Sequence, residues 1–301
     1  MGHEHNHGDM KGKKLGISIL LNVLITVAQA IGALVSGSLS LLSDALHNFS
    51  DVVALIISYI ADKLTQKKFT PEQTFGYKRA EVIAALINAA TLIAIALMIT
   101  KEAIIRFNEP AVIDSLIVII LACMSILVNG GSVLLLKKEA KDNMNMKSAY
   151  LHLMSDMVSS VAVLVGGICM SYFQVFWVDS VLSLAIAIYL IYSSFGLLRQ
   201  TLRVLMQFSP SHLDSKKIEQ ELIKLPFVTN VHHLHLWQLN DKDIHLEAHL
   251  DFSDNLHLSE VSNTIQLASE LLKNKFKIYH TVLQPEIDVD DSKDLIVDER
   301  S

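Results

Sequence analysis

The amino-acid sequence predicts an α-helical membrane protein, a six-span helical bundle followed by a smaller cytoplasmic α+β domain. Of the 301 residues, 51% are hydrophobic and only 19% are charged, a composition typical of membrane proteins. Long runs carry no charged residue, and each has 19 residues or more, enough to cross a hydrocarbon layer of ~30 Å as a helix. The runs are Leu15–Ser43, Val82–Thr100, Ser115–Leu136, Met157–Val178 and Ser180–Leu198.

The first run is too long for a single span. We predict one helix from about Leu15 to Val35, a turn at the sequence SGSLS, and a second helix that continues through Leu46–Ala61. This division gives six spans. Fourteen Lys and Arg residues then fall on one side of the membrane and only Lys101 and Arg106 on the other. Because positive residues favour the cytoplasmic side, we expect both termini in the cytoplasm, as an even number of spans requires.

The chain changes character near Phe208. Residues 1–207 contain 16 basic and 14 acidic residues, whereas residues 208–301 contain 9 basic and 17 acidic residues. We therefore divide the chain into a His-containing cytoplasmic tail (1–14), a six-helix transmembrane domain (15–207), a cytoplasmic domain (208–285) and an acidic tail (286–301). An acidic soluble part argues against nucleic acid as a partner and favours cations.

The cytoplasmic domain has an αββαβ pattern. The pattern predicts helices at Ser215–Leu225 and Leu258–Lys273, and strands at Val228–Leu239, Ile244–Phe252 and Lys277–Leu283. Strand alternation places His245 and His249 on the wet face of the second strand, and His232 on the opposite face from His233. We expect Pro285 to end the last strand. The acidic tail lacks the glycine of an EF-hand loop, so we expect it to be solvated and frayed.

Two copies of one motif carry the chemistry. LHNFSDVV begins at Leu46 and LHLMSDMV at Leu151, so His47 and Asp51, like His152 and Asp156, lie four residues apart in apolar segments. Residues four apart share one face of a helix, and the second and fifth spans run antiparallel. Placed side by side, these spans can direct two imidazoles and two carboxylates at one point, which is the tetrahedral number of ligands that zinc prefers.

The energetic cost of burying these groups favours a functional reading. An aspartate at bilayer depth costs about 2.5–3.5 kcal/mol on insertion scales, and ionisable residues in spans are usually functional. A bound divalent cation would compensate two such carboxylates. Hydrogen bonding between helices without a metal is the alternative, and it also accounts for Asn22, Gln29, Asn88 and Asn129. Asp44, one turn before His47, either lines an ion path or caps its helix.

The sequence resembles the cation diffusion facilitator family, in its zinc/cobalt/cadmium exporter branch. The matching segments are GSLSLLSDALHNFSDVVAL, FGYKRAEVIAAL, NMKSAYLHLMSDMVSSVAVL, HHLHLW and HLEAHL. The resemblance implies a homodimeric metal–proton antiporter whose cytoplasmic domain is metallochaperone-like. It implies the transport site His47, Asp51, His152 and Asp156, and metal ligands His232, His249 and His280 near the dimer contact. Val282 replaces an acidic ligand of some relatives, and Glu286 is a candidate substitute.

The resemblance therefore predicts a divalent metal exporter, in the first place a Zn²⁺/H⁺ antiporter that works by alternating access. Zn²⁺ is its substrate and a candidate structural ion, with Co²⁺, Cd²⁺, Fe²⁺ and Ni²⁺ left open by the N/O ligands. No catalytic cofactor is expected. We expect a multi-pass protein of a bacterial inner membrane. The alternatives are a membrane-embedded metalloenzyme, which would keep one ligand position for water, and a metal channel or sensor. Because the four residues fill all positions and no HExxH occurs, we predict no enzyme.

Overall fold

A computed structural model describes residues 6–65, 67–137, 144–253 and 256–297 of the chain. The chain divides into two compact units. The first comprises Met1–Tyr59 and Ile87–Leu197, and the second comprises Ile60–Leu86 and Leu198–Ser301. His3 and His5, which belong to the predicted N-terminal tail, lie outside the described residues.

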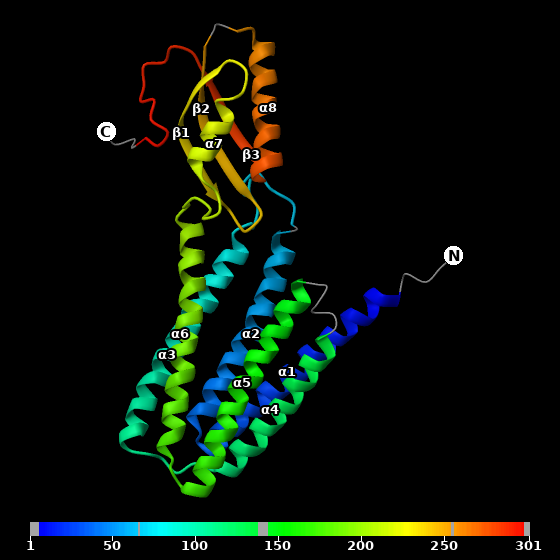
Figure 1. Cartoon of the computed structure of the whole chain (residues 1–301), viewed down its shortest axis with the longest axis vertical. Coiled ribbons are helices and arrows are strands. Elements are labelled where there is room, and N and C mark those ends of the chain that lie inside the picture. The colour runs from blue at the N-terminus through cyan, green and yellow to red at the C-terminus, as the bar shows by residue number, and fades with distance from the viewer. Residues whose placement is uncertain (1–5, 66, 138–143, 254–255, 298–301) are drawn as a thin grey trace. The chain divides into compact units, whose positions relative to one another are not determined.

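Six long helices precede the small sheet domain (Figure 1). They are α1 (Asn6–Ser36), α2 (Leu39–Thr65), α3 (Ala80–Asn108), α4 (Ser115–Leu136), α5 (Met144–Phe173) and α6 (Trp177–Leu205). Within the described residues, five of them, α2 to α6, are long and apolar enough to cross a membrane, and α1 contributes the shorter apolar stretch Leu20–Ser36. The molecule therefore has a helical membrane domain, and its first helix begins earlier than the predicted Leu15.

The turn between α1 and α2 falls where the SGSLS sequence predicted it. Only Gly37 and Ser38 are non-helical between the two helices. Gly37 has a φ of +74°, a left-handed conformation that glycine adopts without strain from a Cβ atom. The Asp114 backbone N–H donates to the Ser36 carbonyl at 3.1 Å, and the Arg106 guanidinium donates to the Gly37 carbonyl at 2.6 Å.

Small side chains let the helices of the first unit approach one another. A Cβ atom on Gly32 of α1 would collide with Leu121 of α4, and one on Gly167 of α5 would press on Ile119 of α4. The hydroxyls of Ser125 and Ser160 share a hydrogen bond of 2.8 Å between α4 and α5. Small residues and buried hydroxyls are the usual means of association between membrane helices.

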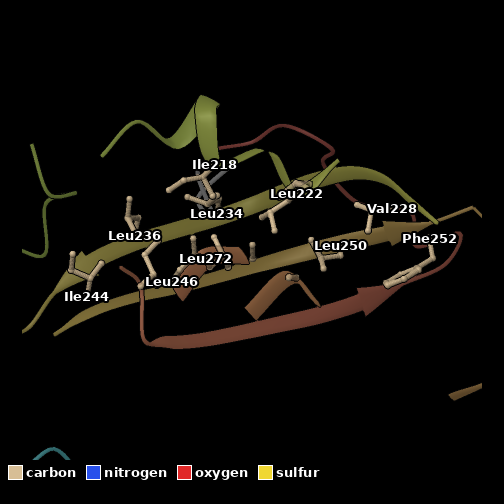
Figure 2. Close-up of a cluster of buried hydrophobic side chains, with 14 residues drawn as sticks. Ile218, Leu222, Val228, Leu234, Leu236, Ile244, Leu246, Leu250, Phe252 and Leu272 are labelled. Atoms are coloured by element: carbon tan, nitrogen blue, oxygen red, sulfur yellow. The ribbon is translucent and has the colours of Figure 1, made fainter. Parts of the chain in front are cut away.

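The second unit contains a three-stranded sheet with two helices on one face. Its elements are α7 (Ser215–Leu222), β1 (Val228–Gln238), β2 (Ile244–Phe252), α8 (Leu258–Phe276) and β3 (His280–Glu286). The strand order is β1-β2-β3, with β1 antiparallel and β3 parallel to β2. Ile218 and Leu222 of α7 and Leu272 of α8 pack with strand residues such as Leu246 and Leu250 into one core (Figure 2).

Three predictions for this unit were wrong. β3 does not end before Pro285 but continues to Glu286; as an edge strand, it tolerates a residue without an N–H. His245 is buried, although strand alternation placed it on the wet face. Residues 287–297 are mostly exposed, as predicted, but they are not frayed, because the backbone N–H groups of His233 and Leu234 donate to the carbonyls of Asp294 and Leu295.

Candidate metal centre

Helices α2 and α5 bring the two copies of the repeated motif together. His47 and Asp51 lie one turn apart on α2, and His152 and Asp156 lie one turn apart on α5. Both segments belong to the first unit. Each histidine lies between both carboxylates, so the four side chains form one cluster, which we call the membrane tetrad.

The contacts of the tetrad cross from one helix to the other. His47 Nε2 lies 3.9 Å from Asp156 Oδ1, and His152 Nε2 lies 3.6 Å from Asp51 Oδ2. Within each helix, His47 Nδ1 is 3.7 Å from Asp51 Oδ2 and His152 Nε2 is 3.5 Å from Asp156 Oδ2. Tetrahedral ligands at Zn–ligand distances near ~2.0–2.1 Å lie about 3.3 Å apart. The observed separations are wider than this spacing, and His47 approaches the two carboxylates through different ring nitrogens, so its side chain would have to rotate before the tetrad could close on an ion.

Several buried polar atoms of the tetrad lack hydrogen-bond partners among the described residues. Among the described residues, His47 Nδ1, Asp51 Oδ2 and both carboxylate oxygens of Asp156 are buried and lack one. Buried polar groups in proteins are nearly always hydrogen-bonded, and exceptions need an explanation. A divalent cation would supply that explanation, because it could coordinate these atoms and neutralise two carboxylates.

Asp44 shows what a structural aspartate looks like in the same bundle. It is fully buried, but its carboxylate accepts hydrogen bonds from Gln29 Nε2 at 2.8 Å and Ser159 Oγ at 2.7 Å. It therefore ties α2 to both α1 and α5, and it does not cap its helix. Ser50 donates to Asn88 at 3.0 Å in the same manner, which confirms Gln29 and Asn88 as interhelical polar contacts.

The members of the tetrad differ in access. The Asp156 side chain is fully buried, whereas 44% of the His152 side chain is exposed. The ring of Tyr189 on α6 lies edge-on to His47, with ring centroids 6.1 Å apart.

A second cluster lies in the cytoplasmic sheet domain. His232 of β1 and His249 of β2 are direct cross-strand partners. His232 Nε2 lies 3.2 Å from Glu286 Oε2, and His249 Nδ1 lies 2.8 Å from Glu286 Oε1. Asp291 completes the group, and one ligand atom from each of the four residues lies within 4.8 Å of all the others. Although they contact opposite charges at these distances, and His232 Nδ1 also lies 3.3 Å from Asp251 Oδ2, His232 Nδ1, His249 Nδ1 and Glu286 Oε2 make no hydrogen bond among the described residues. This donor set therefore suits a metal ion.

A bulge in β1 changes the predicted faces. The pairing of β1 with β2 shifts register between His232 and His235, and His233 has a φ of +51°. The His233 ring consequently stacks on His249, with centroids 4.7 Å apart. His232 and His233, which simple alternation separates, therefore both lie beside His249.

The structure does not place His280 in this cluster. His280 pairs with His245, four residues before His249 on the parallel partner strand, which is about 13 Å along a strand. Its ring lies 4.3 Å from that of His245. Burial lowers the pKa of His245, and the neighbouring His280 and Lys78 lower it further. On β3, Gln284 is the residue opposite His249.

Sequence reasoning missed three charged residues around the second cluster. Lys293 Nζ contacts Asp251 Oδ1 at 3.0 Å and Asp291 Oδ1 at 2.5 Å. Burial opposes the charge of Lys293, but its hydrogen bonds to Asp291 and Asp251 outweigh burial and raise its pKa. The hydrogen bond from Lys293 is also the main reason why the pKa of Asp291 is lowered. The sequence DVDDSKD was the available signal, but without a loop glycine it gave no metal-binding pattern.

A helical membrane domain in which His47, Asp51 and Asp156 have buried atoms without hydrogen bonds, followed by an acidic domain, fits a membrane transporter of metal cations. Comparison with known families supports this class. Residues 15–206 match the family described as "Cation efflux transmembrane domain", and residues 210–288 match "Cation efflux protein, cytoplasmic domain". The chain therefore belongs to the cation efflux family, also called the cation diffusion facilitator family, and it is a transporter and not an enzyme.

Curated relatives align over nearly the whole chain. The "Cadmium, cobalt and zinc/H(+)-K(+) antiporter" of Bacillus subtilis is 34% identical over 288 residues, which cover 95% of this chain and 92% of the relative. The "Cation efflux system protein CzcD" of an Alcaligenes species is 31% identical, with 95% and 90% covered. The "Zinc transporter ZitB" of Pectobacterium atrosepticum is 31% identical, with 95% and 89% covered.

Proposed function

We propose that the protein exports Zn²⁺ from the cytoplasm in exchange for protons, by alternating access at the membrane tetrad. The observation that carries the proposal is the set of unpartnered buried atoms on His47, Asp51 and Asp156. The names of the relatives in Bacillus subtilis and Pectobacterium atrosepticum, an antiporter and a zinc transporter, agree with it.

The proposal assigns six membrane spans, namely the five long apolar helices α2 to α6 and, in addition, α1. Its apolar stretch Leu20–Ser36 is short for a complete crossing, but α1 begins at Asn6 and packs against α4 of the bundle. The excess of Lys and Arg on one side puts both termini in the cytoplasm. We place the protein in a bacterial inner membrane, with the membrane domain at residues 15–207 and the cytoplasmic domain at 208–285.

The exchange of metal for protons follows from the ligand chemistry. Imidazole binds a metal through an unprotonated nitrogen, so Zn²⁺ and protons compete for His47 and His152. An ordinary histidine titrates near ~6.5, within the physiological range. In the proposed cycle, Zn²⁺ enters from the cytoplasm and displaces protons. The bundle then opens to the other side, where protons return to the tetrad and release the ion.

The ligand set also favours release. Two nitrogens and two oxygens bind Zn²⁺ without thiolates, and Cys123 and Cys169 are free cysteines outside the tetrad. A Kd near ~1 μM corresponds to about 8 kcal/mol, whereas structural zinc sites reach roughly 10–16 kcal/mol. Co²⁺, Cd²⁺, Fe²⁺ and Ni²⁺ remain possible substrates for the same ligands.

We assign the cytoplasmic domain to dimerisation and metal binding. Residues 210–288 match the cytoplasmic domain of cation efflux proteins, a family associated with dimerisation. We propose His232, His249 and Glu286 as its metal ligands, on the strength of their mutual distances. Metal binding there would stabilise the homodimer and shift the transport equilibrium.

Metal flux into proteoliposomes tests the proposal. Vesicles with purified protein and an internal pH dye should take up Zn²⁺ and show a luminal pH change in proportion to the flux. A run with a K⁺ gradient replacing the H⁺ gradient separates proton exchange from potassium exchange. Asp51→Ala should abolish the flux of every transported metal. Zinc flux without a coupled ion would indicate a channel, and normal zinc flux by Asp51→Ala would remove the tetrad from the mechanism.

A further inference from the structure

The chain after β3 folds back onto the cytoplasmic sheet. Strand β1 lies at an edge of the sheet, and an edge strand has unpaired backbone groups. Here the N–H of His233 donates to the Asp294 carbonyl at 3.2 Å, and the N–H of Leu234 donates to the Leu295 carbonyl at 2.8 Å. The side chain of Leu295 packs against the domain core. We call residues 287–297 the C-terminal clasp.

The clasp brings two charged side chains to His232. Asp291 Oδ2 lies 3.2 Å from His232 Nε2, while Asp291 Oδ1 is held by Lys293. Lys293 also contacts Asp251 and lies 3.7 Å from Glu286. One oxygen of Asp291 thus faces the histidine cluster, and the other is fixed by the lysine.

The charged side chains around His232 do not balance one another. Asp251, Glu286 and Asp291 together carry three negative charges, and Lys293 supplies one positive charge. The remaining charge of −2 surrounds His232, which is fully buried and whose Nδ1 lies 3.3 Å from Asp251 Oδ2 without a hydrogen bond among the described residues. A divalent cation would neutralise this remainder while Lys293 stays in place.

We propose that the C-terminal clasp closes on a metal ion inside one protomer, with Asp291 as the fourth ligand beside His232, His249 and Glu286. Lys293 is a positioning residue that fixes Asp291 and Asp251. This inference rests on the proposed metal-binding role of the cytoplasmic domain. Its consequence is a local sensor: metal in the cytoplasm determines whether the edge of β1 is covered by the clasp or free.

Hydrogen exchange at the amides of His233 and Leu234 reports closure of the clasp directly, because these amides donate to it. The experiment uses the full chain in nanodiscs, with Asp51→Ala and Asp156→Ala removing metal binding at the membrane tetrad. Addition of Zn²⁺ alone should slow exchange of the two amides by about tenfold or more. Asp291→Asn should abolish this slowing and raise the Kd for Zn²⁺ at least about tenfold, because even outer-shell partners of a metal contribute roughly 10–100-fold.

Asp290→Asn is the matched control, since Asp290 is an exposed neighbour of the same charge; it should keep the full effect of Zn²⁺. Lys293→Met should speed exchange in the absence of metal, and Zn²⁺ should restore protection. The inference is overturned if Zn²⁺ does not change exchange at His233 and Leu234, or if Asp291→Asn behaves like Asp290→Asn. Because the variant used here lacks the carboxylates of the membrane tetrad, such a result would not bear on the transport proposal, which the flux measurement tests separately.

Discussion

At the scale of single residues, the decisive contrast is between aspartates with and without hydrogen-bond partners. Asp44 and Asp156 are both buried in the bundle. Asp44 accepts hydrogen bonds from Gln29 and Ser159, whereas neither oxygen of Asp156 has such a partner among the described residues. Asp44 is thus satisfied by the protein itself, whereas the unsatisfied Asp156 is the one that we propose as a metal ligand.

Asp156→Asn should stop transport without unfolding the protein. The amide keeps the size of the side chain but removes the charge that balances the cation. We expect zinc flux in proteoliposomes to fall more than about 100-fold, because the loss of even an outer-shell partner of a metal costs roughly 10–100-fold. Asp114→Asn is the control: Asp114 caps α4 on the surface, and asparagine caps a helix about as well. Equal flux in the two variants would contradict the assignment of Asp156.

The tetrad was predictable because it depends on short-range geometry. A spacing of four residues fixes His47 and Asp51 on one face of α2, and the repeat fixes the same relation on α5. The cytoplasmic cluster was only partly predictable. Glu286 was found as a candidate, but Asp291 reaches the cluster through a chain reversal, and His280 is separated from it by the register of β2 and β3. Neither the reversal nor the register has a local sequence signal.

At the scale of elements, the turn between α1 and α2 is held by a carboxylate from another helix. Asp179, in the first turn of α6, accepts from the backbone N–H groups of Leu39 and Ser40 at 2.7 and 3.2 Å. It also accepts from the hydroxyls of Ser38 and Ser40. The first N–H groups of a helix lack partners within it, so Asp179 caps α2 from outside its own helix.

Asp179→Ala should destabilise the membrane domain by about 1–3 kcal/mol, because it leaves buried donors unsatisfied. Reversible unfolding in mixed micelles measures this loss. Asp114→Ala provides the comparison, since water can replace an exposed cap and the expected loss is only about 1 kcal/mol. If the two variants lose the same stability, the buried carboxylate has no special role in the turn.

His245 gives the sheet domain a pH-dependent stability. Its ring stacks on Trp237 and lies against His280 and Phe75, and burial, His280 and Lys78 lower its pKa. The unfolded chain takes up a proton near the ordinary histidine value of about 6.5, whereas the folded domain resists it. The folded state therefore loses stability as the pH falls below about 6.5.

Substitution His245→Phe keeps an aromatic ring in the stack and removes the titration. We expect the melting temperature of the full chain to fall less between pH 7.5 and 5.5 in this variant than in the wild type. His212→Gln serves as the control, because His212 is exposed and should leave the pH dependence as it is. If the melting temperature of His245→Phe fell with pH as steeply as that of the wild type, other groups would dominate the destabilisation by acid.

The burial of His245 also shows the limit of strand periodicity. Alternation placed the side chain of His245 on the face of β2 opposite the core, and it assumed that this face meets water. In the second unit that position is covered by Phe75 of the segment between α2 and α3 and by His280 of β3. Periodicity assigns a face but not what covers it, since the covering residues are distant in sequence.

At the scale of the whole molecule, the protein is a cation efflux transporter with two clusters of histidines and carboxylates of different character, which we propose as metal sites. The membrane tetrad has two carboxylates and no nearby lysine contact among the described ion pairs, so its charge matches a divalent cation that must be released. The cytoplasmic cluster has three carboxylates and Lys293, so a divalent cation would balance the charge that Lys293 leaves. We infer that one cluster moves the metal and that the other responds to its concentration.

X-ray absorption of zinc bound to the purified protein tests the central claim most directly. His232→Ala and His249→Ala first remove the cytoplasmic cluster, so that the signal reports the membrane tetrad alone. We predict one zinc per chain with about four N/O ligands near ~2.0–2.1 Å, two of them imidazoles, and loss of this zinc in Asp51→Ala combined with Asp156→Ala. Zinc bound equally well without these two carboxylates, or a shell without imidazole, would contradict the account.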